Sequence, residues 1–402
     1  MARRQAPAAR LKALILSVGV TFTRAALAHA RMVHAKGLQR VYNAPANAPA
    51  DAPQELVLSD TDGYSSCVAA VAPVPGREPV TVDVLDGRVV LRLPGGTDSG
   101  EVEIRYVTTP DYYATLLPSG QPITRVVSTC GLNELNIWPW HDCAIGRLCR
   151  FCGINSVFRS AGSADTLTAR RAGSDDDAPF ASWLFDLTMG VKTATADPIY
   201  ANVLFPMIIS GNLPDALLDR QAELYATIAR EVAPLVAGQS GPEGLVAMTA
   251  PPNDLALLDT QRDAGIRTMA INLEAYTPEA FETECPGKNR IGRARYLAAL
   301  ARSAEVFGAG HAWSNFVLGL EPVGDLLAGC RVLAAQGVTP GASVLHFDEG
   351  AAIRGKVPPT YDGLLSFYHE LAEIYREHGL RPYFNGQALR SSLANEAYDG
   401  RL

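Results

Sequence analysis

The sequence lacks an excess of basic residues, a long apolar run and an even number of cysteines. Its 402 residues carry a formal net charge of −7, whereas a nucleic-acid-binding protein usually presents a basic face. The apolar run at 13–20 is too short to span a membrane. Seven cysteines, three of them spaced as ligands, indicate a reducing compartment rather than a disulfide framework. We therefore expect a cytoplasmic protein that binds neither nucleic acid nor membrane.

The N-terminal segment, 1–41, allows two interpretations. Arg3, Arg4, the apolar run and the small residues at 28–30 resemble a secretory signal peptide. The alternative, which we favour, is an amphipathic helix over 7–37. Its polar side would carry Lys12, Arg24, Arg31 and Lys36.

The composition changes twice after this segment. Residues 42–54 repeat Pro and Ala without periodicity, which is typical of a linker. Between 55 and 128, short alternating runs separated by turn residues predict a small β-rich domain. Because this domain has no cluster of ionisable groups, we expect a structural or partner-binding role. The alternative is a lid, formed by a loop at 60–64 or 112–113.

Strand and helix patterns alternate from 129 to 402, the last part of which is a C-terminal extension. Repeated units of this kind imply a parallel sheet covered by helices. The predicted fold class is therefore α/β, a partial (β/α)6 TIM-like barrel whose site lies on the loops after the strands. The predicted strands are 132–138, 202–209, 244–249, 267–273, 313–320 and 342–347.

Three cysteines follow the first of these strands. Cys143, Cys149 and Cys152 have the spacing C-x5-C-x2-C. Three thiolates on one loop can hold three corners of a cubane iron–sulfur cluster and leave the fourth iron open to a ligand. A zinc site is the alternative, because His141 lies close enough in sequence to be a fourth ligand.

This loop resembles the cluster loop of the radical S-adenosylmethionine (SAM) enzymes, in their biotin synthase-like branch. Phe151 precedes the last cysteine, as an aromatic residue does in that family, although the five-residue gap exceeds the usual three. The resemblance implies a [4Fe–4S] cluster and SAM as cofactors, and a one-electron reductant such as flavodoxin or ferredoxin. It also implies a 5′-deoxyadenosyl radical that takes hydrogen from a small-molecule substrate, in cofactor or natural-product biosynthesis.

The same resemblance assigns two strand ends to SAM. Ser210 and Gly211 would meet the methionine amino group, where a glycine permits close approach. Asn272 and Glu274 match the motif whose carboxylate holds the ribose hydroxyls, with Glu in place of a shorter Asp. The structural alternative for Ser210 and Gly211 is a plain strand-to-helix turn. The alternative for Glu274 is a surface residue at a strand end.

Two further segments would complete the SAM site by this resemblance. Arg293, with Arg295 as second choice, would pair with the methionine carboxylate, which suits a planar guanidinium. Gly319 and Glu321 belong to the motif on the adenine side. A solvated basic helix face is the structural alternative for the two arginines.

Three residues are candidates for a catalytic role toward the substrate. Cys285 is expected in a loop on the active-site side, although a free cysteine is usually a small core residue. His346 and Asp348 follow the sixth strand, where ionisable groups tend to face a substrate. A hydrogen-bonded core histidine beside a surface aspartate is the alternative.

Two other functions fit the sequence. A sulfur-inserting enzyme similar to biotin synthase would need a second cluster, but the second, third and fourth predicted strands contain no cysteine. The other is a non-catalytic scaffold that binds zinc or a cluster and whose β-rich domain recruits a partner.

Overall fold

Short apolar strands and longer helices alternate after residue 126 and build one central sheet. In the computed structural model, the described residues are 7–37, 46–95, 101–145, 149–154, 178–382 and 389–402. Within these ranges the sheet has seven strands in the order β14-β13-β12-β11-β10-β9-β8, with β8 antiparallel to its neighbour and the others parallel. The strands are β8 (Val127–Cys130), β9 (Glu134–Ile137), β10 (Phe205–Ile209), β11 (Val246–Met248), β12 (Thr268–Ala270), β13 (Ala312–Leu318) and β14 (Val338–Val344).

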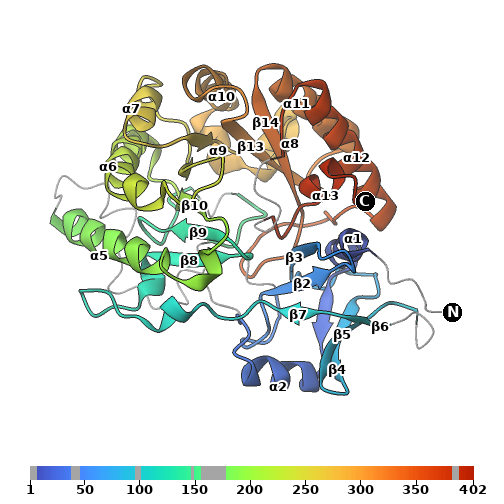
Figure 1. Cartoon of the computed structure of the whole chain (residues 1–402). Helices are drawn as coiled ribbons and strands as arrows, with labels where there is room; N and C mark the ends of the chain where they lie inside the picture. Colours follow the sequence, from blue (N-terminus) through green and yellow to red (C-terminus); the bar gives the residue numbers. More distant parts are fainter. Residues whose placement is uncertain (1–6, 38–45, 96–100, 146–148, 155–177, 383–388) are drawn as a thin grey trace.

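Helices follow the parallel strands and cover the outer face of the sheet (Figure 1). Each predicted strand overlaps an observed one, and the α/β prediction of a partial barrel is confirmed. Among the described residues, β14 and β8 form the two edges and do not pair with each other. The helices are α5 (Ala178–Ala194), α6 (Leu218–Val236), α7 (Leu257–Asp263), α8 (Pro278–Glu284), α9 (Pro286–Ile291), α10 (Arg293–Phe307), α11 (Val323–Ala335), α12 (Tyr361–Glu377) and α13 (Ala394–Tyr398).

Apolar side chains fill the interior of the sheet near the amino ends of its strands. The rings of Phe205 and Trp313 stack with their centroids 6.1 Å apart, and Val246 and Ala270 pack in the same cluster. Phe205 and Val246 are the first residues of their strands and Trp313 is the second of its strand, so this part of the filling lies at the amino ends. Any open space is therefore at the carboxyl ends, where a barrel of this type places its site.

The N-terminal third forms two small sheets beside the barrel (Figure 1). One has the strand order β1-β4-β5-β6 and the other β3-β2-β7. Helix α1 packs against β3 and α12, so this region contacts the barrel directly. None of the helices in the described ranges combines the length and apolar character needed to cross a membrane. The elements are α1 (Ala8–Val18), β1 (Val20–Phe22), α2 (Arg24–Met32), β2 (Glu55–Ser59), β3 (Ser65–Ala69), β4 (Val80–Leu85), β5 (Arg88–Arg92), β6 (Glu101–Glu103) and β7 (Arg105–Tyr106).

The prediction of one amphipathic helix over 7–37 is wrong. The first helix ends at Gly19, which has a φ of 82° and approaches Pro73 so closely that a Cβ would lie 2.5 Å from its Cα. The next residues pair with β4 as a parallel strand instead of continuing the helix. Lys12 and Lys36, expected on a polar face, are almost fully buried and ion-paired.

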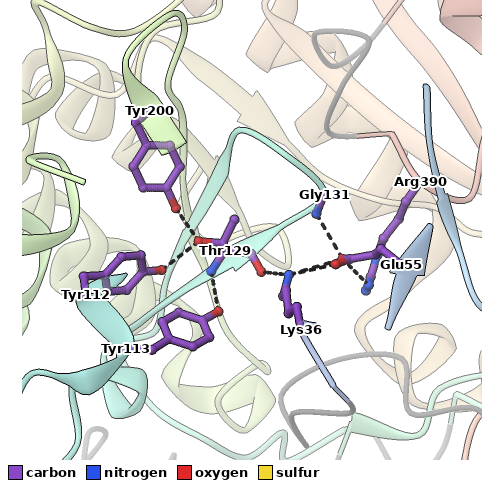
Figure 2. A network of polar contacts seen from close by, with 8 residues as sticks. All are labelled: Lys36, Glu55, Tyr112, Tyr113, Thr129, Gly131, Tyr200 and Arg390. Carbon is purple, nitrogen blue, oxygen red and sulfur yellow. Dashed lines mark hydrogen bonds and ion pairs between the residues drawn. The ribbon is translucent and has the colours of Figure 1, made fainter. Parts of the chain in front are cut away.

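A buried ion network joins the two parts of the chain (Figure 2). The Glu55 carboxylate lies 3.0 Å from Lys36 Nζ and 2.7 Å from a guanidinium nitrogen of Arg390, and it accepts a 3.0 Å hydrogen bond from the Gly131 N–H. Burial alone would raise the pKa of Glu55, but the two cations outweigh it and hold that pKa below its ordinary value. Glu55 therefore stays ionised between them.

The segment at 389–391 lies between the barrel and the β3-β2-β7 sheet. The Val344 N–H donates to Ser391 O at 2.8 Å, and the Ala69 N–H donates to Arg390 O at 3.0 Å. Since Glu55 on β2 also binds Gly131, just after β8, the small sheet connects both edges of the central sheet. The β-rich region thus covers the open side of the partial barrel.

We expect Glu55→Gln to lower the free energy of unfolding by about 3–5 kcal/mol, because it leaves two buried cations without their counter-charge. The control is Glu103→Gln, whose exposed ion pair with Arg88 should cost about 0–1 kcal/mol. Urea unfolding followed by circular dichroism measures both. Equal losses in the two variants would show that the buried network does not stabilise the fold.

Candidate active site

A cavity of about 230 Å³ lies where the parallel strands end. Its wall takes residues from the loop after β9, from the carboxyl ends of β10 to β14, and from the segment at 389–391. Most of the residues singled out from the sequence line this one space. They are Cys143, Cys149, Cys152, Ser210, Gly211, Asn272, Glu274, His346 and Asp348.

The cysteine loop is held between two other segments of the chain. The Arg150 N–H donates to Glu284 O at 2.9 Å, at the end of α8. On the other side, the Ala352 N–H donates to Arg150 O at 2.6 Å. Gly153 lies against the segment after β14, because a Cβ there would come within 3.1 Å of Asp348 Cβ. The described part of the loop, 149–153, is therefore held in place by backbone contacts although it contains no helix or strand.

The turn after β10 positions the first cysteine. The Asn212 N–H donates to Cys143 Sγ at 3.2 Å, and the Ala144 N–H donates back to Asn212 O at 2.8 Å. A Cβ on Gly211 would lie 2.5 Å from Cys143 Cα, so only glycine allows this approach. Ser210, expected to meet the methionine amino group, instead donates its hydroxyl to Trp140 O at 2.7 Å.

The residues around the cavity fit an iron–sulfur cluster. The three thiols line a single cavity, and in the described ranges no three His, Cys, Asp or Glu side chains converge closely enough to hold one metal ion. A cubane spreads its irons over separate corners, so its thiolates need not converge. Burial raises the pKa of the Cys149 and Cys152 thiols well above the ordinary value, and the charge of bound iron would reverse that.

His141 is not placed as a zinc ligand. Its Nε2 is hydrogen-bonded to Arg125 O, and its ring stacks on Trp138 with the centroids 5.9 Å apart. Burial lowers the pKa of His141 to about 4, so its side chain is neutral. His141 is also not among the described residues that line the cavity with the three cysteines, so the zinc alternative lacks this fourth ligand.

Glu274 adopts an unusual backbone conformation in the loop that follows β12. Its φ is 70°, a left-handed value that is uncommon for residues other than glycine and is often associated with functional sites. Its carboxylate is ion-paired with Lys288 Nζ at 2.7 Å, and the same ammonium donates to Asn272 O at 2.6 Å. The sequence predicted Glu274 but not Lys288, which the periodicity of its short helix does not distinguish from its neighbours.

His346 and Asp348 form a polar pair on the cavity wall. His346 Nε2 lies 3.5 Å from an Asp348 carboxylate oxygen, while its Nδ1 lies 2.9 Å from Val344 O. Burial opposes a charge on the ring, but the Asp348 carboxylate outweighs it and raises the pKa of His346. This pair can hold a proton beside whatever occupies the cavity.

A second polar group of the wall was not expected from the sequence. Glu134 and Asn136 on β9 line the cavity together with Arg390 and Cys130. Burial raises the pKa of Glu134 to about 8, against the opposing effect of Arg390. These residues lie inside strands or a loop, and only the pairing of distant segments brings them together.

Five predicted residues are not among the described residues that line the cavity. Arg293 donates twice to Tyr276 O, at 2.8 and 2.5 Å, and Glu321 accepts from the Tyr276 and Thr277 N–H groups. Both side chains therefore fix the loop after β12 rather than face a ligand. The other three lie elsewhere. Arg295 is hydrogen-bonded to the exposed Asn253, and Gly319 packs on Leu345. Cys285 is buried near Cys149.

The two loops considered as lids also lie elsewhere. Tyr112 and Tyr113 are hydrogen-bonded to Thr129 on the edge strand β8, as Figure 2 shows. Asp60 accepts a hydrogen bond from the Ala8 N–H, and the Tyr64 ring stacks under Arg401. Both loops therefore bind parts of the chain that do not border the cavity.

Comparison with known proteins gives a relative in sequence and several solved structures of similar outline. No protein-family model matches the sequence. The bacteriochlorophyllide c C-7(1)-hydroxylase of Chlorobaculum limnaeum is 28% identical over 269 residues. The match covers 64% of this chain and 64% of that protein, so the chain matches less than two thirds of the length of its relative.

Solved structures with a similar outline include the FeFe-hydrogenase maturase HydG from Carboxydothermus hydrogenoformans, which is 13% identical with a TM-score of 0.42 over 68% of this chain and 58% of that one. Methylornithine synthase (PylB) is 13% identical with a TM-score of 0.41, over 66% and 70% of the two chains. A radical SAM methyltransferase from Sphaerobacter thermophilus is 14% identical with a TM-score of 0.39, over 79% and 81%. Likeness at this level carries no conclusion about the reaction.

The resemblance in the sequence and the arrangement of the cavity agree with each other. The loop that resembles a radical SAM cluster loop turns its three cysteines into the space at the strand ends, beside the Glu274 carboxylate. Enzymes of that class use a [4Fe–4S] cluster and SAM, act on a substrate and take electrons from a reductant. The chain thus resembles the radical SAM enzymes in its cysteine loop, and it is similar in sequence to the bacteriochlorophyllide c C-7(1)-hydroxylase.

Proposed function

We propose that this enzyme holds a [4Fe–4S] cluster on Cys143, Cys149 and Cys152 and abstracts hydrogen from a small molecule in the cavity. The observation that carries the proposal is that the three thiols share one cavity with polar groups that follow β10, β12 and β14. When bound, the cluster and SAM supply a 5′-deoxyadenosyl radical that takes hydrogen from carbon. A one-electron reductant such as flavodoxin or ferredoxin is the partner this chemistry needs.

In this proposal, the chain's own residues bind and position SAM and the substrate. The Glu274 carboxylate accepts hydrogen bonds from the ribose hydroxyls of SAM, and Lys288 holds that carboxylate in place. Apolar side chains of Met207, Ile209 and Met248 line the cavity and exclude water from it. The His346–Asp348 pair holds a proton beside the substrate.

Two alternatives are less well supported. A sulfur-inserting enzyme needs a second cluster, but of the four cysteines outside the cluster loop only Cys130 is among the described residues that line the cavity. One thiol cannot hold a cluster by itself. A zinc scaffold lacks His141 as its fourth ligand, because His141 is not among the described residues that line the cavity with the three cysteines.

The relative suggests which reaction to test first. Its name describes hydroxylation at a C-7(1) position of bacteriochlorophyllide c. We propose that the present enzyme likewise acts on a carbon–hydrogen bond, in a cofactor or natural-product pathway.

We expect Cys143→Ala, Cys149→Ala and Cys152→Ala each to abolish the brown chromophore, with its absorbance at about 400 nm, and the formation of 5′-deoxyadenosine, because a cubane needs all three thiolates. Anaerobic reconstitution with iron, sulfide, SAM and dithionite measures both. Cys330→Ala is the control, since Cys330 is buried within α11. Full absorbance in any of the three variants would contradict the assignment of that cysteine.

We expect Gly211→Ala to lose most of the bound iron while the protein stays folded. The added methyl group would displace the Cys143 backbone, from which it would lie only 2.5 Å away. Gly238→Ala is the matched control, because a Cβ there meets no described heavy atom within 4 Å. Iron is counted after reconstitution, and equal iron in the two variants would mean that the turn does not position the cluster loop.

We expect Glu274→Gln to weaken SAM binding by about 1–3 kcal/mol, roughly 5- to 150-fold, because the amide is a poorer acceptor for two hydroxyls. The cluster should remain. Asp259→Asn is the control. Asp259 lies on α7 and pairs with Arg302 on α10, so this variant also breaks an ion pair. Unchanged SAM affinity in Glu274→Gln, measured by equilibrium dialysis, would remove Glu274 from the ribose site.

A further inference from the structure

A buried glutamine on α6, Gln221, binds the turn that follows β10. Its side chain is 1% exposed, on the face of the helix that packs against the sheet. Its Oε1 accepts a 2.7 Å hydrogen bond from the Leu213 N–H. Its Nε2 donates to Asn212 Oδ1 at 3.2 Å and to Thr249 Oγ1 at 2.7 Å. A buried amide is costly unless it is hydrogen-bonded, and here both ends of the amide have partners.

The backbone partners fix the orientation of both amides. The Leu213 N–H can only donate, so the atom of Gln221 that faces it is the oxygen. The Ala250 N–H donates to Asn212 at 2.9 Å, so the atom of Asn212 that faces it is also the oxygen. The NH₂ group of Gln221 then faces the Asn212 oxygen and the Thr249 hydroxyl, whose own proton goes to Ala250 O at 3.1 Å. Exchanging oxygen and nitrogen in either side chain would break these hydrogen bonds.

The residue held in this way, Asn212, contacts the first cysteine of the motif through its backbone. The Asn212 N–H donates to Cys143 Sγ at 3.2 Å. On the other side of the turn, the Trp140 indole N–H donates to Gly211 O at 2.6 Å. The turn is therefore held from α6 by Gln221 and from the cysteine loop by Trp140. Between these two contacts, the Asn212 N–H points at the sulfur.

A hydrogen bond to a ligating sulfur acts unequally on the two oxidation states of an iron–sulfur cluster. Reduction adds negative charge, part of which lies on the thiolate sulfurs, so an N–H group that points at a sulfur stabilises the reduced form more. Hydrogen bonds to the sulfurs are among the features that set the reduction potential of such clusters. Gln221 is not among the described residues that line the cavity, so its effect on the potential is exerted through Asn212.

From this geometry we infer that Gln221 is a positioning residue that raises the reduction potential of the cluster, by holding the Asn212 N–H against Cys143 Sγ. The inference rests on the proposed function, in which Cys143 is a ligand of the cluster. It goes beyond that function, because the potential decides how readily a reductant can deliver the electron. A purely structural role for Gln221 would change stability or iron content and leave the potential of assembled clusters unchanged.

Anaerobic redox titration of the cluster-loaded enzyme, followed by electron paramagnetic resonance of the reduced cluster, tests this inference. The variant is Gln221→Met, which keeps an unbranched side chain of similar length and helix propensity but has no amide. We expect the equilibrium constant for reduction to fall at least tenfold, which lowers the potential by about 59 mV or more for one electron.

Gln261→Met is the matched control. Gln261 is fully buried on α7, and its Nε2 donates to Ala222 O at 3.4 Å. It is not among the described residues that line the cavity, so this variant should keep the wild-type potential. An unchanged or raised potential in Gln221→Met, or an equal shift in Gln261→Met, would overturn the inference.

A second pair of variants serves if Gln221→Met does not fold or holds no cluster. The Thr249 hydroxyl accepts from Gln221 and donates to Ala250 O, so Thr249→Val removes one partner of the Gln221 amide at constant shape. The potential should again fall, and Thr249→Ser, which keeps the hydroxyl, should retain the wild-type value. An unchanged potential in Thr249→Val would then overturn the inference. Failure of the proposed function gives a different result, because the wild-type enzyme itself would then assemble no [4Fe–4S] cluster.

Discussion

One buried carboxylate, that of Glu55, holds three distant parts of this chain together. In a medium of low polarity, Lys36 and Arg390 would each be costly to bury alone, and their shared partner removes most of that cost. The same carboxylate binds the backbone at Gly131, beside the first parallel strand. The position of Arg390 in the cavity wall therefore depends on a residue of the β-rich region. This region supplies no described side chain to the cavity from 55–127, yet it determines part of the wall.

Close backbone contacts hold the cysteine loop in place, as the Glu55 carboxylate holds the distant segments together. The loop has no regular secondary structure where it is described, so its shape depends on the segments that it touches. Gly211 and Gly153 permit approaches that a methyl group would prevent, and Arg150 is bonded on both sides. The cysteines are thus placed by the turn after β10 and the segment after β14. The spacing alone would not achieve this, because it fixes only which residues are available.

The strands of the barrel were predictable because each is a short apolar run between turn residues, and all six predictions overlap observed strands. The N-terminal helix was mispredicted because its apolar period continues through Gly19, while the chain turns there to pair with β4. Helix α5 was not predicted, since neither its boundaries nor its period stand out. Arg293 and Glu321 show a related limit: a charged residue at a strand end can equally well bind loop backbone.

The sequence by itself determined the α/β class, the cysteine motif and the strand ends on which Glu274 and His346 lie. These features depend on local order, because period, spacing and turn chemistry act over a few residues. Only the tertiary structure decided that Lys288 pairs with Glu274, and that Glu134, Asn136 and Arg390 share one wall. The physical reason is that burial and charge pairing depend on which distant segments pack together. Neither the raised pKa of Glu134 nor the shared counter-ion of Lys36 and Arg390 exists until the barrel is covered by the small sheet.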